Sequence, residues 1–312
     1  MIYTELMKIV ITDRIDISEV AQQQIQAMGG AVHDDVPDEA EVIERVKDAE
    51  LITANYIDIT PKVIDAARRL KYIVVPAVGS EWVDKAYAAS KGIVVVNCPT
   101  HNAQAVAEHA LALMFAVQRR LVEAVADLRD GVWKHQDFKG YEVKGSVIGI
   151  VGEGNIGRRL ATMCTGLGAT VTSLNSRSGT DEWNKVLSSS DVLFACLPLN
   201  DRTRHVLNAT AFAKMKQGSI FVNVGRGATV DSEALKTALG SGELSGAGLD
   251  VFENEPLQGS PDDAIVELAR MKNVVATPHM AYNTHETVER LGEELVSNIR
   301  SCILGSPTNV VN

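Results

Sequence analysis

The sequence is short of positive charge, of long apolar runs and of cysteine. Its 312 residues carry 30 Lys and Arg against 40 Asp and Glu, which gives a net charge of −10. A field of this sign repels nucleic acids and anionic membrane surfaces, so neither is expected as a partner. A small anionic substrate would need a local basic centre on such a protein.

No apolar run approaches the roughly 18 residues that suggest a membrane-spanning helix. Residues 1–8 also lack a positively charged start followed by an apolar stretch and a small-residue cleavage site. We therefore expect a cytoplasmic protein with no membrane partner. The four cysteines are scattered without the spacing of a metal site, which favours buried, reduced thiols and no bound metal.

Short β-rich segments alternate with helical segments along the whole chain. This alternation predicts parallel sheets flanked by helices, and the length predicts two domains. In the first part, strands are expected at 8–11, 51–54, 72–75 and 94–96, with helices at 17–28, 40–47 and 61–70.

A second series of strands follows a change of pattern near residue 100. A single long helix is expected over 103–128, as a bridge between domains. Six strands, as in a complete doubly wound dinucleotide domain, are then expected at 146–151, 170–174, 191–196, 219–224, 246–251 and 273–277. A last helix over 284–304 would pack back on the first domain. The predicted domains are therefore a discontinuous substrate domain, 1–100 with 285–312, and a dinucleotide-binding domain, 101–284.

The glycine-rich turn Gly152-Glu153-Gly154-Asn155-Ile156-Gly157 lies between a predicted strand and a predicted helix. In that context Gly152 would make the turn, Gly154 would let a pyrophosphate approach the backbone, and Gly157 would allow the helix to pack closely on the strand. The free amides of the helix N-terminus would face the anion. This arrangement predicts a dinucleotide site.

The residues after the next strand bear on the choice of coenzyme. An acidic residue usually binds the adenosine ribose there, but this chain has Asn175-Ser176-Arg177-Ser178. Arg177 could pair with a 2′-phosphate, and Ser176 or Ser178 could donate hydrogen bonds to it. We therefore favour NADP(H) over NAD(H). The alternative is that Arg177 is a solvated loop residue and that either coenzyme is accepted.

Three polar residues follow three later strands: Arg226, Glu255 and His279. The carboxyl ends of parallel strands share one edge of the sheet, where ligands gather. The planar guanidinium of an arginine suits a substrate carboxylate, and an imidazole beside a carboxylate can move a proton. Each residue alone has an ordinary structural explanation, but together they favour chemistry on a small 2-oxo or 2-hydroxy acid.

With these motifs, and with Ala105-Val106-Ala107-Glu108-His109 and Cys196-Leu197-Pro198, the chain resembles the D-isomer-specific 2-hydroxyacid dehydrogenase family. The resemblance implies a Rossmann-type doubly wound domain inserted into a smaller flavodoxin-like substrate domain, with the active site in the cleft between them. It also implies a homodimer built largely through the helix that begins near Ala103.

By the same resemblance, His279 is the acid/base, Glu255 its partner and Arg226 the anchor of the substrate carboxylate. A nearby carboxylate stabilises an imidazolium and keeps its proton available near neutral pH. Asp250 would lie near the nicotinamide carboxamide, although a strand-end cap is the alternative. His109 is expected to be a packing residue. Further coenzyme contacts are expected at Asn155, Ile156, Leu197, Pro198, Thr203, Val224 and Gly225, and substrate contacts at Asn55, Val78, Gly79 and Tyr282.

The predicted substrate loops, 53–57 and 77–82, carry no cation for a second anionic group. This favours unphosphorylated acids such as glyoxylate, hydroxypyruvate or pyruvate. A phosphoglycerate or D-lactate dehydrogenase that uses NAD remains an alternative. Formate dehydrogenases of the same architecture typically have glutamine where Glu255 stands, which argues against that activity. A nucleotide-sensing corepressor would keep the same three residues, and only turnover would distinguish it.

Overall fold

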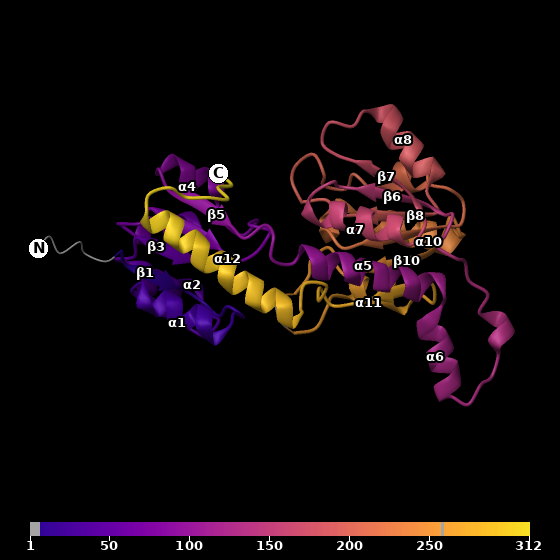
Figure 1. Ribbon diagram of the computed structural model, residues 1–312, viewed down its shortest axis with the longest axis horizontal. Helices are drawn as coiled ribbons and strands as arrows, with labels where there is room; N and C mark the ends of the chain where they lie inside the picture. Colours follow the sequence, from indigo (N-terminus) through magenta and orange to yellow (C-terminus); the bar gives the residue numbers. More distant parts are fainter. Residues whose placement is uncertain (1–6, 257–258) are drawn as a thin grey trace, which may run out of the picture. The chain divides into compact units, whose positions relative to one another are not determined.

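The computed structural model describes residues 7–256 and 259–312 (Figure 1). Residues 1–6, part of the segment in which no secretory signal was found, lie outside this range. The chain forms two compact units. The first comprises the described residues up to Asn102 together with Asn283–Asn312, and the second is Ala103–Tyr282.

The first unit is a five-stranded parallel sheet with helices on both faces. Its strand order, β2-β1-β3-β4-β5, is that of a flavodoxin-like domain. The strands are β1 (Ile9–Ile11), β2 (Gly30–Val32), β3 (Leu51–Thr53), β4 (Tyr72–Val75) and β5 (Val94–Asn97). The helices are α1 (Glu19–Ala27), α2 (Glu39–Val46), α3 (Pro61–Ala66), α4 (Lys85–Ser90) and α12 (His285–Ile303).

Successive residues of these strands enter opposite cores, because side chains alternate across a strand. Ile9 and Leu51 pack with α1 and α12, whereas Val10 and Ile52 pack with α2 and α3. Helix α12, yellow in Figure 1, lies on α1 at a glycine: a Cβ added to Gly292 would stand 2.7 Å from the Cβ of Ala21. The C-terminal helix is therefore part of the core of the first unit.

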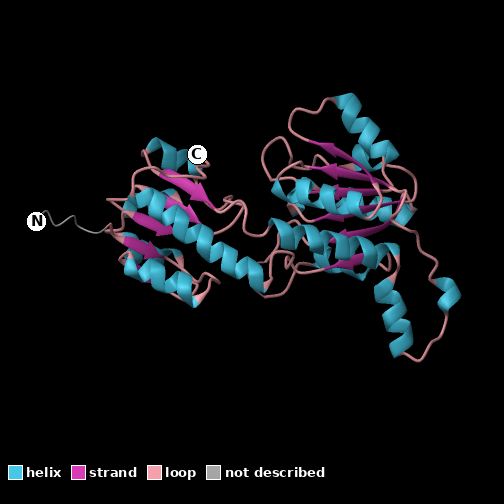
Figure 2. Cartoon of the chain, in the orientation of Figure 1, coloured by secondary structure: helices cyan, strands magenta, loops and turns pink. Residues whose placement is uncertain are grey.

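The second unit is a six-stranded parallel sheet in the order β11-β10-β9-β8-β6-β7 (Figure 2). Its strands are β6 (Val147–Val151), β7 (Thr170–Leu174), β8 (Val192–Ala195), β9 (Ser219–Asn223), β10 (Leu244–Leu249) and β11 (Val274–Ala276). The chain runs from β6 outward to β7 and then crosses to β8 on the other side of β6. The carboxyl ends of β6 and β8 therefore flank a topological switch point, where open α/β sheets bind ligands.

Helices cover both faces of this sheet. Residues of α5 and α7 pack on one face with Ile150 and Phe194, and residues of α8 to α11 pack on the other with Leu193 and Phe221. The helices are α5 (Ala103–Gln118), α6 (Leu121–Arg129), α7 (Asn155–Gly166), α8 (Thr180–Ser189), α9 (Ala209–Phe212), α10 (Ser232–Ser241) and α11 (Asp263–Arg270), with 3-10 turns η1 (His135–Asp137) and η2 (Gly227–Thr229).

The predicted α/β class is confirmed, but some predicted elements are wrong. The single helix expected over 103–128 is two helices, because Arg120 adopts a left-handed backbone (φ 49°) that ends the first one. Strand β2 and helix α4 were not predicted. Within 7–256 and 259–312, no helix is both long and apolar enough to cross a membrane.

Candidate active site

The glycine loop after β6 has the shape of a pyrophosphate cradle. Gly152 has a φ of +109°, and an added Cβ would stand 2.5 Å from the carbonyl oxygen of Cys196, at the switch point. A Cβ on Gly157 would stand 2.0 Å from the carbonyl oxygen of Gly152. Only glycine therefore fits either position.

The third glycine faces open space. No described atom lies within 4 Å of a Cβ added to Gly154, and no described side chain caps α7 at that residue. An anion can consequently approach the backbone closely at the N-terminus of α7, where the helix dipole favours negative charge. Asn155 begins this helix, and its Oδ1 accepts a hydrogen bond from Arg158 at 2.9 Å. The loop thus fits the pyrophosphate of a dinucleotide, with Ile156 in its first turn.

The residues after β7 form a hydrogen-bonded turn. The Asn175 amide donates to Ser178 Oγ at 3.3 Å, and the Arg177 amide donates to Asn175 Oδ1 at 3.0 Å. The side chain of Asn175 also donates from Nδ2 to Glu153 at 2.8 Å. The structure therefore brings the residues expected at the adenosine ribose together, with Ser176 exposed between them. It adds Glu153, which the sequence had not indicated.

Arg226 stands on a tightly held loop after β9. The Gly225 amide donates to Asn223 Oδ1 at 3.0 Å, and Thr229 Oγ1 donates to the Arg226 carbonyl at 2.7 Å. A Cβ on Gly225 would stand 2.7 Å from the carbonyl oxygen of Leu197, and one on Gly227 would stand 1.9 Å from the carbonyl carbon of Phe252. The loop is thereby pressed between the ends of β8 and β10. The Arg226 guanidinium is half-buried and donates to the Gly225 carbonyl at 2.9 Å.

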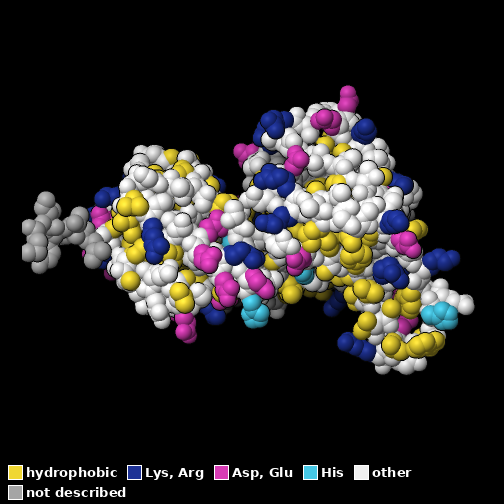
Figure 3. Space-filling model, in the orientation of Figure 1, with side chains coloured by type: hydrophobic (Ala, Val, Ile, Leu, Met, Phe, Trp, Pro, Cys, Tyr) yellow, Lys and Arg dark blue, Asp and Glu magenta, His cyan; other side chains and the backbone are white. Residues whose placement is uncertain are grey.

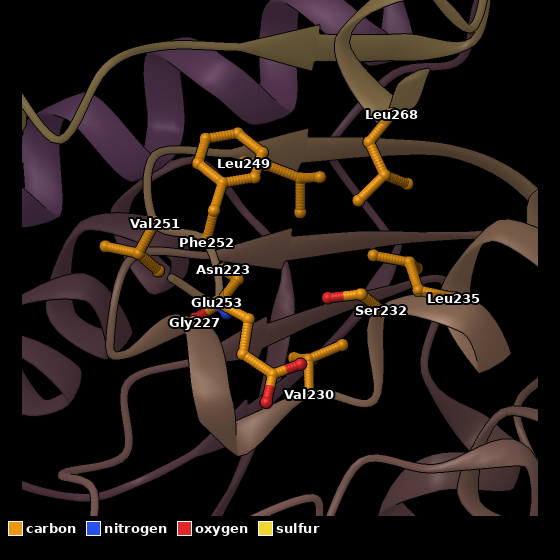
Figure 4. A pocket seen from close by; sticks show the side chains of 10 residues that line it. All are labelled: Asn223, Gly227, Val230, Ser232, Leu235, Leu249, Val251, Phe252, Glu253 and Leu268. Carbon is orange, nitrogen blue, oxygen red and sulfur yellow. The ribbon is translucent and has the colours of Figure 1, made fainter. Parts of the chain in front are cut away.

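A small pocket lies behind this loop (Figure 4). Leu235 and Leu268 stand on one side of it, and Glu253 stands on the other. The Glu253 carboxylate pairs with His205 Nε2 at 2.7 Å, a second histidine and carboxylate pair that the sequence had not indicated. With its apolar lining, the pocket belongs to the packing that supports the loop.

The structure brings Glu255 and His279 together. Glu255 Oε2 lies 2.5 Å from His279 Nδ1, and its Oε1 accepts the Phe252 amide at 2.6 Å. The Tyr282 ring meets the imidazole edge to face, with the ring centroids 6.1 Å apart. With the carboxylate on Nδ1, the other ring nitrogen is the one that can exchange a proton with a ligand.

Asp250 organises the segment that carries His279. Its carboxylate, 1% exposed, accepts hydrogen bonds from Thr277 Oγ1 (2.6 Å) and from the amides of Met280 (3.0 Å) and Ala281 (2.9 Å). Burial alone would raise the pKa of Asp250, but hydrogen bonds, with those of His109 and Thr277 foremost, lower it overall. The carboxylate is therefore ionised at neutral pH and caps this strand end.

The backbone of His279 is itself unusual. It lies in the left-handed region (φ 49°), and its amide donates to the Asp250 carbonyl at 2.8 Å. Strained backbone of this kind persists only where the surroundings impose it. His109, expected only to pack, takes part in this arrangement, because its Nε2 lies 3.0 Å from Thr277 Oγ1 and 3.5 Å from Asp250 Oδ1.

The remaining candidates of the second unit lie at neighbouring strand ends. Thr203 Oγ1 donates to the Pro198 carbonyl at 2.7 Å in the loop after β8, Leu197 is half-buried in the same loop, and Val224 is buried at the end of β9. No group of three or more His, Cys, Asp or Glu side chains among the described residues could hold a metal ion.

The candidate substrate residues of the first unit follow β3 and β4. The amides of Asn55 and Tyr56 donate to the buried carboxylate of Asp13, and burial raises the pKa of that group. The Val78 carbonyl accepts a hydrogen bond from Asn97 Nδ2 at 2.7 Å, and Gly79 is buried beside it.

The structure also qualifies the prediction that the loop over 77–82 has no cation. Lys85 Nζ donates to Ser80 Oγ at 3.0 Å, so a positive charge does reach this loop from the first turn of α4. The prediction from the sequence did not include Lys85, because this residue lies three positions after the end of the loop.

The chain is similar to known dehydrogenases and reductases. The family described as D-isomer specific 2-hydroxyacid dehydrogenase, NAD binding domain, matches residues 111–281. A hydroxypyruvate reductase from Thermotoga maritima is 37% identical over 80% of this chain and 83% of that relative. A D-3-phosphoglycerate dehydrogenase from Mycobacterium leprae is 34% identical over 92% of this chain, which spans only 56% of that longer relative. A solved acyclic imino acid reductase, in complex with NADPH and D-Arg, is 29% identical with a TM-score of 0.90, over 98% of this chain and all of that one.

Proposed function

This chain belongs to the D-isomer-specific 2-hydroxyacid dehydrogenase family, oxidoreductases that act on CH–OH groups with a nicotinamide coenzyme, and we propose that it interconverts a small unphosphorylated 2-oxo acid and its D-2-hydroxy acid with NADP(H). The observation that carries the proposal is the contact of 2.5 Å between Glu255 and His279. Both residues follow strands of the sheet that carries Arg226.

In this proposal His279 is the acid/base of the reaction. When the nicotinamide is bound it supplies or accepts the hydride. During reduction, His279 donates its proton from Nε2 to the oxygen of the substrate carbonyl, and during oxidation the neutral imidazole takes a proton from the hydroxyl. Glu255 holds the ring by Nδ1 and balances the charge of the imidazolium.

Arg226 is proposed to bind the substrate carboxylate through its guanidinium fork. The support is its rigid loop, which both flanking glycines allow to pack closely on neighbouring backbone. Asn55, Val78, Gly79 and Tyr282 are proposed as the other substrate contacts. Asp250 is proposed to lie near the nicotinamide carboxamide, in addition to its role as a cap.

The preference for NADP(H) rests on the turn after β7. Arg177 is exposed there and no acidic residue follows the strand, so a 2′-phosphate would find a cation. The similar imino acid reductase was solved with NADPH, which supports the proposal. NAD(H) stays possible, because the family is described by an NAD-binding domain.

A panel of 2-oxo acids tests the reaction. Glyoxylate, hydroxypyruvate, pyruvate and phosphohydroxypyruvate are each assayed with NADPH and with NADH, and we expect turnover of an unphosphorylated acid with NADPH. His279→Ala should lower kcat by about 10²- to 10⁴-fold and leave coenzyme affinity unchanged. Coenzyme binding without turnover of any acid would instead support nucleotide sensing. A preference for the phosphorylated acid would assign Lys85 and its loop to a second anion.

A second candidate is the reduction of an imino acid. It is favoured by the TM-score of 0.90 with the acyclic imino acid reductase. The same site would then deliver the hydride to an imine carbon, and the product would be an amino acid. NADPH oxidation that requires both a 2-oxo acid and an amine distinguishes this reaction from simple reduction of the 2-oxo acid.

We also propose that the protein is a homodimer, through a surface that includes α6. This helix stands away from the sheet of its own unit (Figure 1), and hydrophobic side chains gather over it (Figure 3). Leu121, Val122, Val125 and Leu128 are each about half exposed, which is unusual for four large apolar residues on one short helix. Light scattering at micromolar concentration tests the dimer. The cytoplasmic location stays a prediction.

A further inference from the structure

Glu153 reaches from the glycine loop to the end of β7. Its Oε1 accepts a hydrogen bond from Ser173 Oγ at 3.1 Å, and its Oε2 accepts one from Asn175 Nδ2 at 2.8 Å. Ser173 is the next-to-last residue of β7, just before the loop that carries Arg177. The sequence places no acidic residue after β7, but the fold brings one there from 20 residues upstream.

The carboxylate is embedded in a small charged network. Asn175 joins Glu153 to the turn, because its Oδ1 accepts the Arg177 amide while its Nδ2 donates to the carboxylate. Arg158 donates to the Glu153 carbonyl at 2.9 Å. The hydrogen bonds from Asn175 and Ser173 lower the pKa of Glu153, with the charges of Arg158 and Arg177 adding to them, so the group is an anion at neutral pH.

Glu153 and Arg177 carry opposite charges and would therefore affect binding of the ribose 2′ substituent in opposite ways. A ribose 2′-hydroxyl can donate a hydrogen bond to a carboxylate, whereas a 2′-phosphate is repelled by it. Arg177 attracts the phosphate. Glu153 would thus accept the hydrogen bond of the ribose hydroxyl in place of the acidic residue that many dinucleotide sites carry at the end of the second strand.

We propose that Glu153 is a specificity-determining residue for the coenzyme, which favours a free 2′-hydroxyl and limits the preference for a 2′-phosphate that Arg177 creates. The inference rests on the proposed binding of the adenosine ribose beside residues 175–178. The proposal predicts that the protein discriminates only modestly between NADP(H) and NAD(H), because two opposite charges lie beside the ribose 2′ position, where the two coenzymes differ.

Binding of two adenosine fragments tests this without turnover. The fragments are 2′,5′-ADP and 5′-AMP, which differ only in the 2′-phosphate, and their Kd values are measured by calorimetry with the full chain. Glu153→Gln should tighten the binding of 2′,5′-ADP by about 5- to 10-fold, as expected for the loss of one exposed charge. The binding of 5′-AMP should be unchanged or slightly weaker. Because Glu153 is exposed, an unchanged Tm is expected.

A matched control makes the same charge change at the opposite edge of the sheet. Glu243 immediately precedes β10, and Glu243→Gln should alter neither Kd. Arg177→Gln should weaken 2′,5′-ADP by at least about 10-fold, as loss of a charge-assisted pair does. The proposal is overturned if Glu153→Gln changes both Kd values by the same factor or changes neither.

The failure of this inference can be told from the failure of the proposed NADP(H) preference. The wild-type ratio of the two Kd values reports the preference, whereas the change of that ratio in Glu153→Gln reports the role of Glu153. A wild-type protein that binds 5′-AMP more tightly than 2′,5′-ADP contradicts the preference for NADP(H). A shift toward 2′,5′-ADP in the variant then still supports the role of Glu153.

Discussion

Replacing Asp250 with asparagine should loosen the segment that carries His279. The carboxylate accepts hydrogen bonds at both oxygens, from Thr277 and Met280 on Oδ1 and from Ala281 on Oδ2. Asparagine keeps the size of the side chain but offers only one acceptor atom and places an NH₂ group at the other. Whichever way the amide turns, at least one buried donor then faces another donor.

The expected cost follows from this geometry. A buried donor without an acceptor costs about 1–3 kcal/mol, and exchanging a charged acceptor for a neutral one removes about 1 kcal/mol more from each bond that remains. We therefore expect the free energy of unfolding of the second unit to fall by about 2–4 kcal/mol at pH 7.

The effect should depend on pH with a defined sign. The pKa of Asp250 is lowered in the folded protein, so its contribution is complete above the unfolded pKa, about 4, and is lost as the pH falls through the lower, folded pKa. The difference between wild type and Asp250→Asn should hence be constant from pH 7 to about pH 5 and narrow at lower pH.

Hydrogen exchange is the assay, because two compact units can unfold separately and a single transition is not assured. Amides of residues 274–282 should exchange faster in Asp250→Asn, and urea unfolding followed in the same samples gives the free energy. Asp263→Asn, the same substitution at an exposed residue of α11, should stay within about 0.5 kcal/mol of wild type. A variant with unchanged exchange in 274–282, or a difference that widens toward pH 4, would refute the reasoning.

Three further predictions concern the coenzyme loop, the proton-transfer pair and the surface of α6. Gly157→Ala should weaken NADPH binding by at least about 10-fold, because its Cβ would stand 2.0 Å from the Gly152 carbonyl oxygen. The control is Gly166→Ala in the same helix, whose Cβ would meet no described atom within 4 Å and which should leave the Kd of NADPH unchanged. Glu255→Gln should lower kcat of reduction by about 10- to 100-fold and leave the coenzyme Kd unchanged, since the His279 imidazolium loses its anionic partner. The matched control is Glu253→Gln, which removes the carboxylate beside His205. Equal kcat values in the two variants would contradict the role assigned to Glu255. Replacing both Val125 and Leu128 by lysine should give monomers in light scattering, and an unchanged mass would exclude this surface from the dimer.

Most of the fold could be predicted because the strands are buried on both faces. Segments such as Ile148–Val151 and Val192–Ala195 contain no polar side chain and are buried, as strands of parallel sheets typically are. Strand β2 has no such pattern: Gly30–Val32 is a three-residue edge strand without full burial, positioned by its pairing with β1. The break at Arg120 depends on one backbone angle in a sequence of good helix formers, so composition could not locate it.

The parts of the candidate site that follow strands were predicted, and the parts built by contacts between loops were not. The carboxyl ends of parallel strands must share an edge, which is why Arg226, Glu255 and His279 could be grouped from the sequence alone. The contacts of Glu153 with Asn175, of His205 with Glu253 and of His109 with Thr277 join residues 22 to 168 positions apart. These pairings depend on the path of the loops, which no local pattern encodes.

The return of the chain to its first unit has a consequence during synthesis. Helix α12 supplies Leu295 and Ile299 to the core that also contains Ile9 and Leu51, so one face of the first sheet lacks one of its two covering helices until residues beyond Gly292 have left the ribosome. At roughly 5–20 residues per second, the roughly 190 residues between Asn102 and that helix take roughly 10 to 40 s. The second unit is one continuous segment and has all its own strands before then. The unit that is begun first is thus completed last, and the part of its apolar face that α12 covers stays exposed in the interval.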